Sequence, residues 1–159
     1  RQQYPQAIFQ LLGDCGVPNP SVIGREEIAQ WEKEGVVEYL GTTDDVRPII
    51  AQADCLVLPS YREGIPRTMI ESAAMAKPLI VSDAPGCRDV VLDGQTGYLC
   101  EVKNALSLAQ RCEQFLVLSE SEKQVMGKAG RRFMVAKFVE NWVIKQYLAT
   151  LKRYDVLAC

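Results

Sequence analysis

Short apolar runs alternate with amphipathic segments along the first two thirds of the chain. The runs are rich in Val, Ile and Leu, and each is followed by turn residues, which is typical of buried strands. Segments with helical spacing lie between them, and this alternation favours a parallel sheet. The predicted strands cover residues 8–12, 36–40, 55–58, 79–81 and 97–99.

The segments between the strands, and all of the chain after the last strand, have the spacing of helices. Predicted helices cover residues 25–33, 45–53, 66–76, a short stretch at 88–92, 105–118 and 120–137. A final helical segment carries Phe138, Trp142, Tyr147, Leu148 and Leu151, which we expect to pack in the core. The predicted fold is therefore α/β and Rossmann-like, with a parallel sheet, helices on both faces and a helical C-terminal extension.

Composition excludes several classes of protein. With 159 residues and 48% apolar content, the chain is long enough for a single core. A net charge of -2 gives no basic field for nucleic acid. The six cysteines form no Cys-x-x-Cys pair and there is no histidine, so we expect no zinc site and reduced thiols in a cytoplasmic setting. No apolar run is long enough to span a bilayer, and the N-terminus does not resemble a signal peptide.

The most informative stretch is LPSYREGIPRTMIE at residues 58–71, which runs from a strand end through a loop into a helix. Pro66 is predicted in the first helical turn, where a missing N–H is harmless. The N–H groups of Arg67 and Thr68 would then point out of the helix, and the positive end of the helix dipole would lie beside them. A helix end of this kind suits a diphosphate.

Two glutamates bracket this helix end. Glu63 precedes the helix and Glu71 lies within it, so their carboxylates are placed to accept hydrogen bonds from hydroxyls on either side of a diphosphate. Taken singly, each glutamate is better explained as a solvated charge near a helix start.

The pair of glutamates and its surroundings resemble a known family. Glu63 and Glu71 are separated by seven residues, as in the signature of the group 1 retaining glycosyltransferases, which have the GT-B fold. The resemblance extends, in the family's order, to VVEYLG at 36–41, ADCLVLPS at 53–60, KPLIVSD at 77–83, PGCRDVV at 85–91 and DGQTGYL at 93–99. It covers nearly the whole chain.

The resemblance implies a role for each matching residue. Glu63 is implied to contact the donor sugar and to support charge at the reacting centre, and Glu71 to bind ribose hydroxyls. Backbone amides of Arg67 and Thr68 are implied to hold the diphosphate. The remaining implied donor-binding residues are Gly64 and Ile65 beside the first glutamate, and Leu40, Thr42 and Thr43 beside the base.

The chain also departs from the family's pattern. Pro66 stands where a second glycine is common, Ser72 where a small residue follows the second glutamate, and Ala76 where a glycine often ends the helix. The family's C-terminal domain normally opens with a strand and a loop that carries an arginine and a lysine. We therefore expect residues 1–159 to be a partial C-terminal donor-binding domain, without the first strand or the N-terminal acceptor domain, and to be inactive alone.

The implied reaction transfers a hexose-type sugar from a nucleoside diphosphate to an acceptor hydroxyl with retention of configuration. The sequence is similar to bacterial enzymes of polysaccharide and surface-glycan synthesis, and this similarity implies uridine diphosphate as the nucleotide. Helix N–H groups and arginines such as Arg62 and Arg67 can stabilise the departing diphosphate, and there is no Asp-x-Asp metal signature. We therefore expect no cofactor and no metal.

Three other interpretations are weighed against this one. A Rossmann dehydrogenase is disfavoured because Gly13-Asp14-Cys15-Gly16 lacks the full glycine fingerprint. A non-catalytic nucleotide-sugar-binding module would share the same donor site. A basic cluster, made of Lys128, Arg131, Arg132 and Lys137, would suit peripheral contact with the inner face of the membrane, although a solvated helix face is the better explanation from sequence alone.

Overall fold

The computed structural model describes residues 3–15 and 23–153, and for residues 140–142 it describes the backbone alone. The chain divides into two compact units, residues 1–46 and 47–159, which are considered separately. Residues 16–22 and 154–159 lie outside the described part, as does the side chain of Trp142 in the predicted C-terminal stripe.

The first unit contains one helix and two short parallel strands. Strand β1 (Gln10–Leu11) pairs with β2 (Glu38–Tyr39), and α1 (Arg25–Lys33) connects them. Both strands are shorter than predicted, because only two residues of each pair across the ladder. Helix α1 has the predicted bounds, and its first turn carries Glu26 and Glu27, which favour the positive end of the helix dipole.

The second unit is built on a three-stranded parallel sheet in the order β3-β4-β5. The strands are β3 (Leu56–Leu58), β4 (Leu79–Ser82) and β5 (Gly97–Cys100). All four residues of β4 are buried although alternate residues point to opposite faces, so both faces of the sheet are covered. The α/β alternation predicted from the sequence is confirmed.

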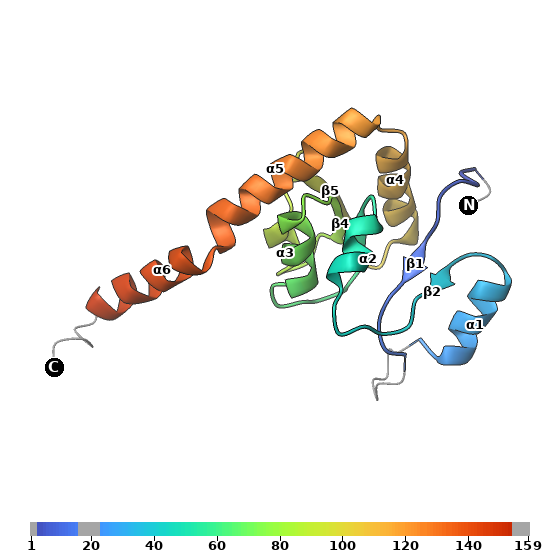
Figure 1. Cartoon of the computed structure of the whole chain (residues 1–159), viewed down its shortest axis with the longest axis horizontal. Coiled ribbons are helices and arrows are strands. Elements are labelled where there is room, and N and C mark those ends of the chain that lie inside the picture. Colours follow the sequence, from blue (N-terminus) through green and yellow to red (C-terminus); the bar gives the residue numbers. More distant parts are fainter. Residues whose placement is uncertain (1–2, 16–22, 154–159) are drawn as a thin grey trace. The chain divides into compact units, whose positions relative to one another are not determined.

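The helices of this unit follow one another in the predicted order. They are α2 (Arg47–Gln52), α3 (Arg67–Ala74), the 3-10 turn η1 (Arg88–Val90), α4 (Ala105–Leu116), α5 (Glu120–Phe138) and α6 (Glu140–Arg153). Helix α5 lies against α3 (Figure 1). The core that they enclose contains Met69 and Ala73 of α3, Leu79 and Val81 of β4, and Met134 of α5. Within the described part of the chain, no helix combines the length and the apolar character needed to cross a bilayer.

The end of α3 is held in a Schellman arrangement. Lys77 N donates to Ser72 O at 3.0 Å and Ala76 N donates to Ala73 O at 2.9 Å. Ala76 has a φ of 59°, so an alanine occupies the left-handed position that the family's glycine would fill. The departure noted in the sequence therefore has a conformational cost.

The expected core packing of the C-terminal aromatic stripe is partly wrong. Phe138 packs against the core, but Tyr147 is 69% exposed and Leu148 is 45% exposed. The chain leaves helical geometry at Val139, where ψ is 139°, and Figure 1 shows α6 continuing beyond the sheet. The helical spacing predicted an apolar face correctly, but the described residues do not cover it.

Candidate functional site

Three loops of the second unit leave the carboxyl edge of the parallel sheet, where ligands of such sheets bind. They follow β3, β4 and β5 and comprise residues 59–66, 83–87 and 101–104. The loop after β3 carries Glu63 and leads into α3. The geometry of this loop and helix decides what the site can bind.

Helix α3 begins with backbone donors that have no acceptor among the residues that the structure describes. Pro66 was predicted in the first turn of this helix, but it is the N-cap, because its ψ of 109° is extended. Its carbonyl accepts from Met69 N at 3.0 Å and Ile70 N at 3.2 Å. In the described part of the chain the N–H groups of Arg67 and Thr68 find no hydrogen-bond acceptor, and the proline ring offers no side-chain cap. These two donors are therefore available to an anion.

Glu71 lies one turn into α3 and is paired with Arg67. Its Oε1 is 3.0 Å from Arg67 Nε. The Arg67 side chain is 91% exposed and that of Glu71 39%, so the ion pair is solvated and worth at most about 1 kcal/mol. A ligand that offers hydroxyls to Glu71 can displace Arg67 at little cost, which leaves the guanidinium close to the helix end.

Glu63 is half-buried, whereas its predicted partners Gly64 and Ile65 are exposed. Beneath this segment lies Cys87, which is fully buried. Burial raises the pKa of the Cys87 thiol, and the charge of nearby Glu63 raises it further. Cys87 is therefore a neutral thiol, which agrees with assigning it no catalytic role.

A cation that the sequence did not single out also reaches this edge. Lys103, in the loop after β5, places Nζ 5.2 Å from the centre of the Tyr61 ring, in the loop that carries Glu63. Lys103 has a φ of 60°, an uncommon conformation for a residue with a side chain. The signal available in the sequence was its position a few residues after a predicted strand.

The predicted base-binding residues belong to the first unit. Leu40 N donates to Leu11 O and Gly13 N donates to Gly41 O, both at 2.8 Å, so the ends of β1 and β2 are joined. Thr42 and Thr43 are exposed, and Thr43 Oγ1 accepts from Asp45 N at 3.1 Å. The loop from Leu40 to Thr43 is therefore fixed by its own backbone and presents exposed residues.

A cluster of polar side chains lies close to this loop in the same unit. Tyr39 Oη donates to Gly13 O at 2.7 Å and lies 3.6 Å from Cys15 Sγ. Interaction with Tyr39, and then with Arg25, lowers the pKa of the Cys15 thiol. These contacts hold the segment after β1 against β2.

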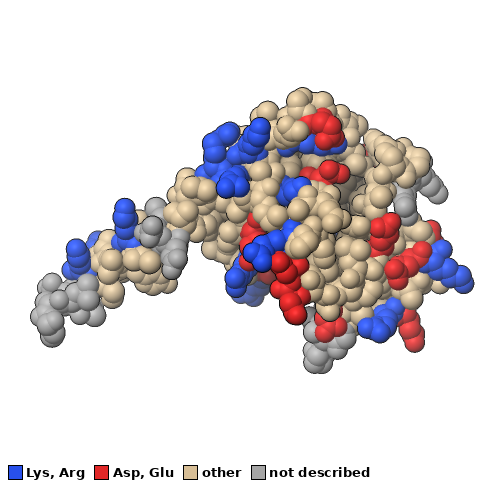
Figure 2. Space-filling model, in the orientation of Figure 1, with Lys and Arg blue, Asp and Glu red and all other residues tan. Residues whose placement is uncertain are grey.

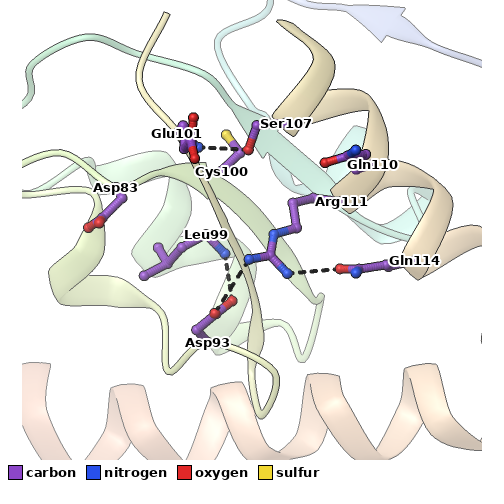
Figure 3. Close-up of a pocket in the computed structure, with 9 residues that line it drawn as sticks. All are labelled: Asp83, Asp93, Leu99, Cys100, Glu101, Ser107, Gln110, Arg111 and Gln114. Carbon is purple, nitrogen blue, oxygen red and sulfur yellow. Dashed lines mark hydrogen bonds and ion pairs between the residues drawn. The ribbon is translucent and has the colours of Figure 1, made fainter. Parts of the chain in front are cut away.

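A pocket of about 400 Å³ lies elsewhere in the second unit, between β5 and α4 (Figure 3). Arg111 points toward Asp93, with 3.8 Å between charged atoms, and donates to Gln114 at 2.9 Å. Asp93 also accepts from Leu99 N at 2.8 Å. These polar groups satisfy one another and tie α4 to β5, and none of the predicted donor-binding residues lines the pocket. We assign it a structural role.

The structure thus groups six of the predicted residues on one loop and helix start: Glu63, Gly64, Ile65, Arg67, Thr68 and Glu71. Leu40, Thr42 and Thr43 form a separate loop in the first unit. In residues 3–15 and 23–153, His, Cys, Asp and Glu side chains form no group of three that would hold a metal ion.

Comparison with known proteins places this geometry in a family. Residues 1–117 match the family described as "Glycosyl transferases group 1". The chain is 33% identical over 151 residues to N,N'-diacetylbacillosaminyl-diphospho-undecaprenol alpha-1,3-N-acetylgalactosaminyltransferase of Campylobacter jejuni, covering 94% of this chain and 37% of that protein. It is 32% identical over 124 residues to N-acetyl-alpha-D-glucosaminyl L-malate synthase of Bacillus anthracis, covering 78% of this chain and 32% of that protein.

Solved structures agree on the fold. Crystal structures of HepE from Anabaena, in complex with UDP and with UDP-glucose, align with TM-scores of 0.82 and 0.79 at 21% identity, covering 94% of this chain and 42% of theirs. The Rossmann-like α/β fold expected from the sequence is confirmed by this likeness. The chain spans between about a third and two fifths of the length of these relatives. It belongs to the group 1 glycosyl transferase family.

Proposed function

We propose that this chain forms the donor-binding part of a glycosyltransferase that transfers a sugar from a nucleoside diphosphate, of the UDP-hexose class, to an acceptor hydroxyl with retention of configuration. The reaction belongs to polysaccharide or surface-glycan synthesis in this proposal. The observation that carries it is the start of α3, where two unpaired backbone N–H groups lie between Glu63 and Glu71. The names of the relatives and the UDP complexes of HepE support the substrate class.

Each part of the donor then has a partner in the site. The diphosphate lies against the N–H groups of Arg67 and Thr68, where the helix dipole favours negative charge. Glu71 accepts hydrogen bonds from ribose hydroxyls after Arg67 is displaced. Glu63 contacts the sugar and supports positive charge at its anomeric carbon as the leaving group departs. For Leu40, Thr42 and Thr43, which belong to the first unit, we propose contact with the base from their match to the family's pattern.

Negative charge that develops on the departing diphosphate is stabilised by donors of this chain. The N–H groups at the start of α3 are already oriented toward the diphosphate and need not move during the reaction. The exposed Arg67 side chain leaves Glu71 when ribose binds there and becomes free to approach the diphosphate. We propose that donor binding is metal-independent, on the basis of these donors and of a sequence without an Asp-x-Asp signature. The acceptor, a glycan or a lipid-linked glycan, is proposed to bind outside this chain.

The donor assignment is tested by calorimetric titration of the chain with UDP and with GDP. Glu71→Ala removes charge-assisted hydrogen bonds to ribose, which are worth about 1.5–3 kcal/mol, so it should weaken UDP binding by roughly tenfold or more. Glu113→Ala is the matched control, because Glu113 is also a half-buried glutamate on a helix, α4. Equal affinities for UDP in the wild type and in Glu71→Ala would refute the assignment, and tighter binding of GDP would refute the choice of base.

We further propose that the outer face of α5 contacts an anionic membrane surface that holds a lipid-linked acceptor. Lys128, Arg131 and Arg132 are exposed on this helix, and Figure 2 shows basic side chains gathered over α5 and α6. Lys137 does not belong to this face, contrary to the prediction, because its Nζ donates to Asp89 O at 3.1 Å and lies 5.3 Å from the rings of Phe133 and Phe138.

Vesicle flotation tests the membrane proposal. Each basic group near an anionic surface contributes about 1 kcal/mol, so Arg131→Glu should lower binding to phosphatidylglycerol vesicles by at least roughly tenfold at low salt. Lys33→Glu on α1 makes the same charge change at an exposed position on a different helix. If both variants bind the vesicles equally well, the α5 face is not the membrane contact.

A further inference from the structure

Gly86, in the turn after β4, lies against the backbone of the loop that carries Glu63. Gly86 is buried and has a φ of 83°. A Cβ atom built on it would lie 1.6 Å from Gly64 O, 2.6 Å from Gly64 C and 2.7 Å from Glu63 O. Side-chain carbons essentially never approach backbone atoms within 3.0 Å. Any side chain at Gly86 would therefore push the Glu63–Gly64 segment away.

The turn that carries Gly86 is held from several sides. Its neighbours Ala84 and Cys87 are buried, with 1% and 0% of their surface exposed. Gly86 N donates to Asp89 Oδ2 at 3.3 Å, and Arg88 N donates to Ala84 O at 3.0 Å. Since the turn is anchored in the core, the loop above it is the part that would move.

Further bonds anchor the start of this turn. Asp83 N donates to Cys100 O at 2.7 Å, which ties the turn to the end of β5. The Arg88 guanidinium lies 2.9 Å from Asp83 Oδ1 and also donates to Asp83 O at 2.9 Å. These bonds fix the position of Gly86 against the loop that follows β3.

We propose that Gly86 is a positioning residue for Glu63: its bare Cα is the surface on which the Glu63–Gly64 backbone rests, and this contact sets the position of the carboxylate that faces the donor sugar. The inference rests on the proposed function of Glu63. All three nearest atoms to the added Cβ belong to Glu63 and Gly64, whereas the groups that bind diphosphate and ribose lie after Pro66 on α3. A substitution at Gly86 should therefore alter the contact between Glu63 and the sugar and leave the diphosphate and ribose contacts in place.

The readout is the gain in affinity that the sugar adds to UDP. Titrations with UDP, UDP-glucose and UDP-N-acetylglucosamine give this gain as a ratio of dissociation constants for each variant. Gly86→Ala should reduce the gain at least tenfold, to that of Glu63→Gln, because a displaced carboxylate loses its charge-assisted hydrogen bonds to the sugar. The affinity for UDP itself should change by less than threefold.

Gly94→Ala is the matched control. Gly94 has a φ of 72°, so alanine is strained there in a similar way, but an added Cβ meets nothing within 4 Å. This variant should keep the full gain. Asp89→Ala is a second, milder variant, because Asp89 is exposed and its loss removes a bond to Gly86 N without adding an atom to the core. It should reduce the gain in the same direction.

The double variant Gly86→Ala/Glu63→Gln separates positioning from general damage. If Gly86 acts through Glu63, the double variant loses no more of the gain than Glu63→Gln alone. Additive losses, or a Gly86→Ala variant that matches Gly94→Ala, would overturn the positioning role. If Gly86→Ala does not fold, Asp89→Ala decides, and an unchanged gain in that variant overturns the role.

The same titrations test the proposed function separately from the positioning role of Gly86. A wild-type chain that binds UDP with dependence on Glu71, and gains from the sugar through Glu63, upholds the proposed function whatever Gly86→Ala does. A wild-type chain that gains nothing from either sugar contradicts the sugar contact of Glu63 and the positioning role together.

Discussion

Helix α5 approaches the end of α3 so closely that Gly127 leaves no room for a side chain. A Cβ atom on Gly127 would lie 1.9 Å from Ala76 O and 2.8 Å from Ala76 C, and both of these are backbone atoms. Substitution by alanine therefore requires the two helices to separate by roughly 1 Å. One turn further along α5, a Cβ on Gly130 would meet its nearest atom, Thr96 Cβ, at 3.7 Å, which is ordinary contact.

Two opposing effects decide the sign of Gly127→Ala. Alanine is favoured over glycine within a helix by about 1 kcal/mol. Forcing an extra atom into packed surroundings costs about 1–3 kcal/mol, and the upper value applies where the clash is with backbone. We expect Gly127→Ala to lower the free energy of unfolding by about 2 kcal/mol. Gly130→Ala should raise it by up to about 1 kcal/mol, because only the helix preference acts there.

Urea unfolding followed by circular dichroism measures both variants. For a typical slope of about 1.5 kcal/mol per molar urea, the midpoint should fall by about 1 M in Gly127→Ala and rise by about 0.5 M in Gly130→Ala. The same substitution on one helix thus has opposite effects. A Gly127→Ala variant that is as stable as Gly130→Ala would refute the close packing of α5 on α3.

Three further predictions follow from single features. Ala76→Gly should stabilise the chain by about 0.5–1 kcal/mol in urea unfolding, because relief of the left-handed conformation exceeds the entropy that glycine adds to the unfolded state. Hydrogen bonds from the Ser119 hydroxyl and N–H lower the pKa of Glu122 in the capping box. The carboxylate of Glu122 therefore stabilises the fold fully above the ordinary glutamate pKa, and this stabilisation is lost as the pH falls through the lowered pKa. Glu122→Gln should flatten this acid dependence of the free energy of unfolding. UDP affinity should be the same in EDTA and in millimolar Mg²⁺, and a clear loss in EDTA would contradict metal-independent binding.

The order and type of elements could be predicted from the sequence because each depends on local pattern. Apolar runs followed by turns gave the strands, and α1 has its predicted bounds. Placement of Pro66 was one residue off because proline fits both the N-cap and the first turn, and the extended ψ that distinguishes them depends on the preceding loop. Exposure of Tyr147 was missed because helical spacing identifies an apolar face without identifying what covers it.

The candidate site also has a part that local sequence predicts and a part that it does not. The local part, with two glutamates around a helix start, was accessible from the sequence and from the family it resembles. The contacts of Gly86 with Gly64, and of Lys103 with Tyr61, join residues that are far apart in sequence and depend on three strands ending at one edge. Such contacts depend on tertiary packing, which local sequence patterns cannot predict.

Donor binding at the start of α3 can be followed at single residues by titrating the isotopically labelled chain with UDP and recording its backbone amide resonances. We expect saturable shifts that are largest at the amides of Arg67 and Thr68, because these are the unpaired donors at the start of α3. Saturable binding with unchanged Arg67 and Thr68 amides, and with the largest shifts at Gln110 and Arg111 in the pocket between β5 and α4, would contradict it.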